Sequence, residues 1–256
     1  MKTTYSAYGI SEKELNDWDE FLSFVTSNLK YRHFIWRGQA DSSWLLEPTL
    51  DRILRTISKV GDTRTINSHL KRFKYAIRGR RGLNPPTLEN DNDWWALGQH
   101  QGLYTPLLDW TKSPFVAAFF AFDSQSESST GRHAIYGISQ HTFQELSNRL
   151  KKEHKSSSRP PIIDFVEPFS NENARLVNQG GLFTRSPAGV DIESWMKTNF
   201  EKDDSHIRMW KLLLPDSEKK KILQSLNRMN INHLSLFPDI YGASKFVNLD
   251  LEIVDY

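Results

Sequence analysis

Polar side chains that can do chemistry are concentrated between residues 98 and 122. Within fourteen positions stand His100, Gln101, Thr105, Asp109, Thr111 and Ser113, with apolar runs on either side. A segment directed to the core has no packing reason to carry so many hydrogen-bonding groups unless they are satisfied locally or serve a site. The stretch is therefore a candidate site for acid–base chemistry or for binding a polar ligand.

This stretch predicts a strand, a tight turn and a buried helix. Residues 104–108 form the strand and residues 109–114 the turn, with Ser113 as helix N-cap and Pro114 at the first helical position. Residues 115–122 are apolar on nearly all sides, which is typical of a helix inside a domain. The unpaired N–H groups at its start suit an anion such as a pyrophosphate. Alternatively, Asp109 caps only the turn and Ser113 only the helix.

A second candidate stands far upstream, at the end of a predicted strand over residues 33–37. Arg37 is delivered by this strand to a loop at the sheet edge, and its guanidinium can contact a carboxylate or a phosphate through two hydrogen bonds. An ion pair that holds the loop is the alternative interpretation.

Basic residues are clustered in residues 71–81, with aromatic residues between them. The cluster consists of Lys71, Arg72, Lys74, Arg78, Arg80 and Arg81. Such a surface can contact a nucleic-acid backbone, whereas the alternative is a solvated helical face. The formal net charge of +2 excludes a bulk nucleic-acid binder, so attraction to phosphate must come from local clusters of this kind.

The remaining pattern predicts one domain over residues 1–256. An N-terminal helix is expected over residues 11–30, because Ser11 and Glu14 have capping-box spacing, and a core that carries the motifs is expected over residues 33–248. Cysteine is absent, and neither a signal peptide nor a membrane span is visible, so we expect a cytoplasmic protein that does not enter a membrane. The eight histidines lack metal-ligand spacing, so no metal site is expected.

Four motifs in this chain resemble those of the FRG domain family. They are Trp36-Arg37-Gly38-Gln39, the string from Gln99 to Ala117 that contains Leu107-Leu108-Asp109-Trp110-Thr111, Arg175 with Gln179-x-Gly181-x-Phe183, and Leu236-Phe237-Pro238-Asp239. They span roughly residues 33–248 in the family's order. This resemblance implies a bacterial toxin or anti-phage defence setting, and it leaves open whether a partner protein inhibits the activity.

A second resemblance, to ADP-ribosyltransferases of the Arg-Ser-Glu type, concerns fold and chemistry. It implies an α+β fold in which a curved, split antiparallel sheet with flanking helices holds NAD between its halves. Arg37 would then contact the phosphates or ribose, the Gly38 backbone would pair with the nicotinamide amide, and Thr111 or Ser113 would support the ribose. Trp36 or Trp110 would cover the nicotinamide ring, and Gln39 and Gln179 join the same NAD-binding set.

The sequence departs from that pattern at its third element. Where a glutamate is expected, this chain has Gln179-Gly180-Gly181, and a glutamine cannot carry the negative charge that stabilises an oxocarbenium-like transition state. Asp109 or Asp239 would have to supply the carboxylate, and Asp109 is favoured because it shares its turn with other polar groups. His100 is either a general base or a neutral, hydrogen-bonded supporting residue.

Two functions follow from these features. The first is an NAD-using enzyme that transfers ADP-ribose to a macromolecule, possibly a nucleic acid or a protein, or that hydrolyses NAD, with Arg37, His100 and Asp109 as catalytic residues. The second is a non-catalytic module that binds a nucleotide, a nucleic acid or a protein at a degenerate site. Convergence of Arg37 with Asp109 in one hollow is the spatial requirement of the first.

Overall fold

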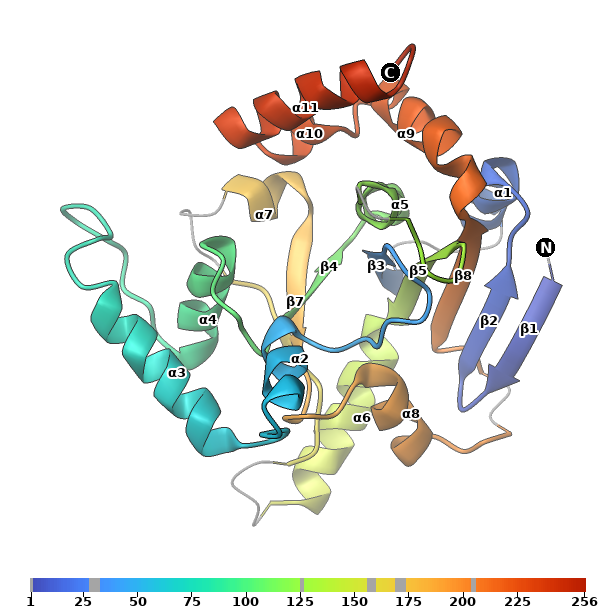
Figure 1. Cartoon of the computed structure of the whole chain (residues 1–256). Coiled ribbons are helices and arrows are strands. Elements are labelled where there is room, and N and C mark those ends of the chain that lie inside the picture. The colour runs from blue at the N-terminus through green and yellow to red at the C-terminus, as the bar shows by residue number, and fades with distance from the viewer. Residues whose placement is uncertain (1, 28–32, 125–126, 156–159, 169–173, 204–205) are drawn as a thin grey trace.

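A single sheet of eight strands forms the centre of the fold. The computed structural model describes residues 2–27, 33–124, 127–155, 160–168, 174–203 and 206–256. Its strand order is β1-β2-β8-β5-β3-β4-β7-β6. The strands are β1 (Lys2–Ala7), β2 (Ile10–Glu14), β3 (Phe34–Gln39), β4 (Leu108–Thr111), β5 (Arg132–Ser139), β6 (Asp164–Val166), β7 (Gly181–Arg185) and β8 (Met209–Pro215). Neighbours are antiparallel except β2 and β8, which confirms the α+β class (Figure 1).

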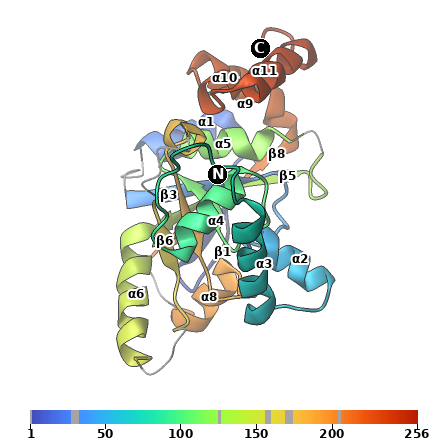
Figure 2. The same ribbon diagram turned by 90° about the vertical axis from the view of Figure 1, so that its left-hand side faces the viewer.

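Helices cover the sheet in three groups, each with its own apolar cluster. One face packs on α1 (Trp18–Ser27), α5 (Pro114–Phe122), α9 (Lys219–Arg228), α10 (His233–Leu236) and α11 (Ile240–Glu252). The other face packs on α6 (Gln140–Glu153) and α8 (Ile192–Asn199). A third cluster joins β6 and β7 to α2 (Thr49–Thr56), α3 (Thr63–Ala76) and α4 (Asp91–His100), and α7 (Ala174–Asn178) precedes β7. Figure 2 shows α3 and α4 facing the viewer.

Strands β3 and β4 are joined by fewer residue pairs than any other neighbouring strands of the described sheet. Trp36 and Thr111 are the one residue pair that joins these strands, whereas β3 pairs with β5 along six residue pairs and β4 pairs with β7 along four. The expected split sheet is thus corrected to one continuous sheet with a weak junction. Beyond the single pair the two strands diverge, which leaves room for side chains between them.

The N-terminal helix starts later than predicted. Residues 10–14, which include the expected capping box, form β2 beside β8 because Ile10 is buried in the sheet core. Helix α1 begins at Trp18, where the carboxylate of Asp17 accepts the backbone N–H of Glu20 at 2.8 Å. Asp17 therefore provides the cap that the Ser11 pattern suggested six residues too early. Residues 28–30 of the predicted helix lie outside the described part of the chain.

The central stretch is also shifted. The strand predicted over residues 104–108 is β4, Leu108–Thr111, so Asp109 lies within a strand and not in the turn. The side chains of Leu108 and Trp110 are buried on one face of the sheet, and the Asp109 side chain between them points to the other face. Side chains alternate between the two faces in this way along any strand. The rest of the prediction is confirmed: Ser113 caps α5 by accepting the N–H of Val116 at 3.3 Å, and Pro114 is the first helical residue.

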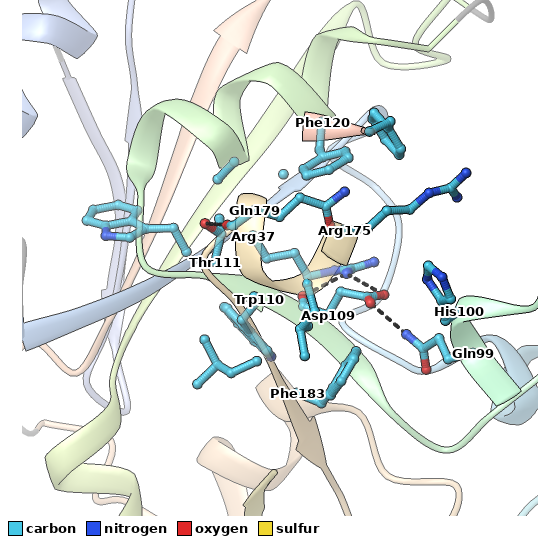
Figure 3. Close-up of a pocket in the computed structure, with 17 residues that line it drawn as sticks. Arg37, Gln99, His100, Asp109, Trp110, Thr111, Phe120, Arg175, Gln179 and Phe183 are labelled. Carbon is cyan, nitrogen blue, oxygen red and sulfur yellow. Dashed lines mark hydrogen bonds and ion pairs between the residues drawn. The ribbon is translucent and has the colours of Figure 1, made fainter. Parts of the chain in front are cut away.

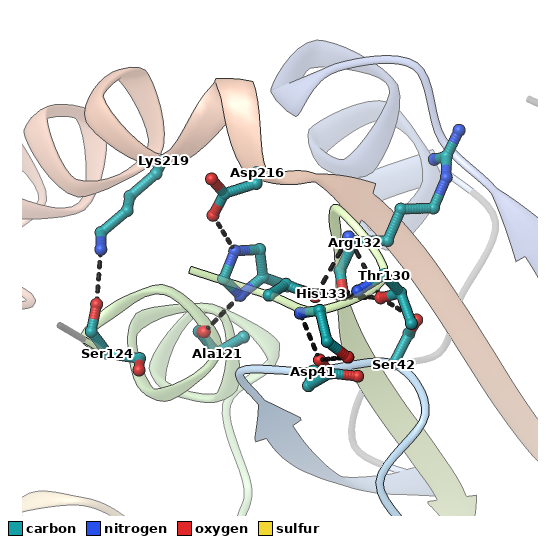
Figure 4. A network of polar contacts seen from close by, with 11 residues as sticks. Asp41, Ser42, Ala121, Ser124, Thr130, Arg132, His133, Asp216 and Lys219 are labelled. Atoms are coloured by element: carbon teal, nitrogen blue, oxygen red, sulfur yellow. Dashed lines mark hydrogen bonds and ion pairs between the residues drawn. The ribbon is translucent and has the colours of Figure 1, made fainter. Parts of the chain in front are cut away.

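A buried polar network ties the sheet to its connections near the end of α5 (Figure 4). The ring of His133, in β5, lies 2.8 Å from the Ala121 carbonyl through Nδ1 and 2.6 Å from the Asp216 carboxylate through Nε2. Asp41 accepts four hydrogen bonds of 2.6 to 2.8 Å, from the backbone N–H and hydroxyl of both Ser43 and Ser129. The network fixes the loops that follow β3 and precede β5. No helix of the described residues is long and apolar enough to cross a membrane.

Candidate functional site

A cavity of about 400 Å³ opens where β3 and β4 diverge. Its walls come from β3, α4, β4, α5, α7, β7 and the residue Phe237, so segments from most of the chain meet there. In Figure 3, Phe120 and Phe183 lie on opposite sides of Arg37 and Asp109. Its volume lies in the range of small-molecule sites, which are apolar pockets with a few convergent polar groups.

Arg37 and Asp109, which the sequence analysis required to converge in one hollow, both line this cavity. The guanidinium donates to the backbone carbonyl of Asp109 at 2.9 Å, and the same nitrogen lies 3.8 Å from the Asp109 carboxylate. Strands β3 and β4 share a single residue pair, so no backbone N–H of β3 reaches the Asp109 carbonyl. The Arg37 guanidinium supplies the hydrogen bond to this carbonyl in its place. The Arg37 Nε is buried and has no hydrogen-bond partner among the described residues.

The protonation of Asp109 is set by opposing effects. Burial raises its pKa, while the positive charge of Arg37 and a hydrogen bond from Gln99 lower it again. Its side chain is 62% exposed and that of Arg37 is 19% exposed, but the surface of Asp109 faces the cavity, whose walls reduce hydration. Burial likewise lowers the pKa of Arg37, and the charge of Asp109 opposes this shift. The pair thus has the perturbed environment that is typical of functional sites.

Gln99 is a site residue that the sequence analysis passed over. Its amide donates to the Asp109 carboxylate at 2.7 Å, and its carbonyl accepts the hydroxyl of Thr105. Gln99 therefore orients the carboxylate from the C-terminal turn of α4. Its position directly before His100, inside the longest motif, was the signal that could have identified it.

His100 lines the cavity from the end of α4 (Figure 3). Burial lowers the pKa of His100 first, the nearby charge of Arg175 lowers it further, and Asp239 opposes both. The ring is therefore favoured in its neutral form. It forms no hydrogen bond among the described residues, so the proposed hydrogen-bonded supporting role finds no partner there.

Arg175 supplies a second guanidinium to the cavity, from α7. It donates to the Asp239 carboxylate through Nε at 2.7 Å and through Nη2, and it lies over the ring of Phe237 at 5.3 Å. Asp239 is the N-cap of α11, where it accepts the N–H of Gly242 at 3.0 Å. That hydrogen bond, followed by Arg175, lowers the pKa of Asp239. Asp239 is thus committed to a structural ion pair and does not line the cavity.

The two tryptophans expected to cover a nicotinamide ring are buried in the core. Trp36 has no exposed surface and Trp110 is 3% exposed, with its Nε1 donating to the Thr184 hydroxyl at 2.8 Å. Both residues border the cavity, but their rings are almost fully buried in the apolar clusters on which the helices pack, so an indole cover over a nicotinamide ring stays a prediction. Three phenylalanines, Phe120, Phe183 and Phe237, also line the cavity.

Several other expected ligand contacts are structural. Gly38 borders the cavity and packs on α5, whereas Gln39 turns away from the cavity and donates to the Leu45 carbonyl at 3.2 Å. Ser113 does not line the cavity, so the backbone N–H groups at the N-terminus of α5 are not placed to bind an anion there. Thr111 borders the cavity, but its hydroxyl donates to the Gln179 carbonyl at 2.6 Å. Gln179 also borders it, and its amide donates to the Leu236 carbonyl at 3.2 Å.

The basic cluster lies on α3 and the turn that follows, away from the cavity. Lys74 forms an ion pair with Asp91 at 2.7 Å, and Arg81 donates to the Pro86 carbonyl at 2.7 Å. Arg80 donates to the carbonyl of Ala76 at 2.9 Å. Lys71, Arg72 and Arg78 are exposed and form no ion pair among the described residues. No group of three or more His, Cys, Asp or Glu side chains in the described part of the chain could hold a metal ion.

Comparison with known families assigns one part of this architecture. The FRG domain family model matches residues 32–130, which include Arg37, Gln99 and Asp109. In residues 32–130 this chain is therefore similar to the FRG domain family. Neither the curated proteins nor the solved structures gave a match. Arg175, Gln179 and Phe237 lie beyond the matched residues, so the cavity is completed by the C-terminal half of the chain.

Proposed function

We propose that this protein binds NAD in the cavity and breaks its nicotinamide–ribose bond, to transfer ADP-ribose or to hydrolyse the dinucleotide. The observation that carries the proposal is the convergence of Arg37 and Asp109, 72 positions apart, in one cavity of small-molecule size. Two arginines on different walls suit a diphosphate, because guanidinium groups bind phosphate oxygens through paired hydrogen bonds.

In this proposal each polar residue has one task. Arg37 and Arg175 bind the diphosphate, and Asp109 provides the negative charge that stabilises the oxocarbenium-like ribose as nicotinamide departs. Gln99 holds the carboxylate in position, and the apolar walls from Phe120 and Phe183 exclude water. His100, which lines the cavity and whose pKa is lowered by burial, is available in its neutral form to take a proton from an incoming nucleophile.

A degenerate binding site is the second candidate, and one observation favours it. The position expected to hold a glutamate carries Gln179, whose amide already donates to the Leu236 carbonyl. The Asp109 carboxylate is already bound to Gln99 and lies beside Arg37. A site of this kind would bind the dinucleotide without cleaving it.

Calorimetric titration with NAD, paired with measurement of released nicotinamide, tests both candidates. We expect Arg37→Ala to weaken binding by about tenfold or more, since it removes a charged donor, and Arg37→Lys to restore part of it. Asp109→Asn keeps the shape of the side chain, so it should retain binding and lose nicotinamide release. Arg149→Ala, an exposed arginine on α6, is the matched control.

The outcomes separate the two candidates. Binding without release in the wild-type protein supports the degenerate site. No heat with the wild-type protein would reject NAD as the ligand. Release by Asp109→Asn at the wild-type rate would reject Asp109 as the stabilising carboxylate. Melting curves of each variant distinguish loss of binding from loss of folding.

A further inference from the structure

We propose that α3 and the turn after it bind single-stranded nucleic acid, on a surface separate from the cavity. The first observation is charge. Residues 63–88 contain seven lysines and arginines and no aspartate or glutamate, although the whole chain is nearly balanced, with 33 basic and 31 acidic residues. A local excess of this size attracts a polyanion even when the global charge is small.

The helix arranges part of this charge in a line. Arg64, Lys71 and Arg78 are seven positions apart, about two helical turns, so they follow one stripe about 21 Å long. Arg78 lies just past the last turn of α3, where its N–H donates to the Tyr75 carbonyl at 3.3 Å and continues the helical path. All three are exposed and form no ion pair among the described residues.

An aromatic ring lies within the stripe. Tyr75 is 59% exposed and stands four positions after Lys71 and three before Arg78, whose guanidinium is 5.9 Å from its ring centroid. Alternation of cations with an exposed ring is typical of surfaces that stack the bases of a single strand while they neutralise its phosphates. In a duplex the bases are already stacked on one another, so Tyr75 favours single-stranded over double-stranded partners.

The neighbouring groove widens this surface. Lys71 and Lys74 also line an open groove of about 770 Å³ together with Asn67, Arg185 and two aspartates, Asp91 and Asp164. Lys74 is partly neutralised by Asp91, which leaves Lys71 as the cation shared by stripe and groove. A strand that follows the stripe can therefore place phosphates or bases in this groove.

The stripe is independent of the NAD proposal because α4 covers the other side of α3. His69 stacks on Trp95 with ring centroids 5.9 Å apart, and the Phe73 ring lies 3.2 Å from where a Gly98 Cβ would be. These contacts face away from the stripe, so a strand bound to α3 does not enter the cavity. Figure 2 shows α3 facing the viewer beside α4. The two surfaces can thus be tested separately.

Fluorescence anisotropy with labelled oligonucleotides of about 12 nucleotides tests the proposal. The probes are single-stranded DNA, single-stranded RNA, the DNA duplex and a polyglutamate peptide of similar charge, each without NAD. The variant Arg64→Glu/Lys71→Glu/Arg78→Glu is compared with Lys152→Glu/Lys155→Glu/Lys220→Glu. The second variant changes the net charge by the same amount at exposed lysines on other parts of the surface.

We expect the wild-type protein to bind both single strands more tightly than the duplex or the peptide. The α3 variant should lose at least about tenfold in affinity, and its slope of log affinity against log salt should become shallower by about 2, because three phosphate contacts are lost. Tyr75→Ala should lose about tenfold without a change of slope. The control variant should bind like wild type.

Equal affinities of the α3 and control variants would overturn the proposal, as would binding of the duplex or the peptide as tight as that of the single strands. An unaffected Tyr75→Ala variant would reject base stacking and with it the preference for single strands. In every case, NAD binding by the α3 variant measures the cavity separately.

Discussion

Replacement of Gly38 by alanine tests why the aromatic-Arg-Gly signature contains a glycine. A Cβ at this position would lie 1.9 Å from the Ala117 carbonyl oxygen and 2.5 Å from the Ala121 nitrogen, both backbone atoms of α5. The helix would have to move by about 1.5 Å to restore a normal contact, since carbon and oxygen atoms repel at shorter separations. We expect a cost of about 3 kcal/mol of unfolding free energy, at the upper end for overpacked cores.

Thermal unfolding followed by circular dichroism measures this cost. For a domain of this size, about 3 kcal/mol corresponds to a fall in Tm of about 6–12 °C. Gly98→Ala is the matched control, because its new Cβ would meet the movable end of the Leu103 side chain, 2.6 Å away, within a helix that favours alanine. A Gly38→Ala variant as stable as Gly98→Ala would refute the packing explanation and return Gly38 to a role in ligand binding.

Three further predictions concern protonation. Gln99→Leu removes a hydrogen bond that lowers the pKa of Asp109, so this pKa should rise further. The acidic limb of the pH profile for nicotinamide release should then move to higher pH. An unchanged limb would exclude Asp109 as the group that causes it. Burial raises the pKa of Asp41, but hydrogen bonds from Ser129 and Ser43 lower this pKa by more. The ionised carboxylate therefore stabilises the fold fully above about pH 4, and this stabilisation declines at lower pH. Asp41→Asn should cost about 2 kcal/mol of unfolding free energy at neutral pH, and the difference in Tm from wild type should shrink in acid. Arg175→Ala removes a positive charge that lowers the pKa of His100, so NMR titration should show that pKa rising, and no change would place the two side chains out of electrostatic contact in solution.

Local patterns predicted the elements that carry the site. The strand before Gly38 and the buried helix with its Ser113 cap follow from periodicity and capping, which act over a few residues. The pattern failed where two local signals competed. Ser11 and Glu14 have capping-box spacing, yet burial of Ile10 beside β8, about 200 residues away in sequence, places them in a strand. A strand pairing between residues so far apart cannot be predicted from the few residues around Ser11.

The sequence by itself determined the chemistry of this protein: a guanidinium at a strand end, a carboxylate among polar residues, a basic helix without acidic residues, and the motifs of the FRG domain. Only the tertiary structure decided which of these groups share a site. It united Arg37 with Asp109 and added Gln99 and Arg175, while it buried Trp36 and Trp110 in the core. The periodicity of apolar residues along a strand or helix shows on which face of that element a residue lies. Which other element packs against that face is set by contacts between segments far apart in the sequence.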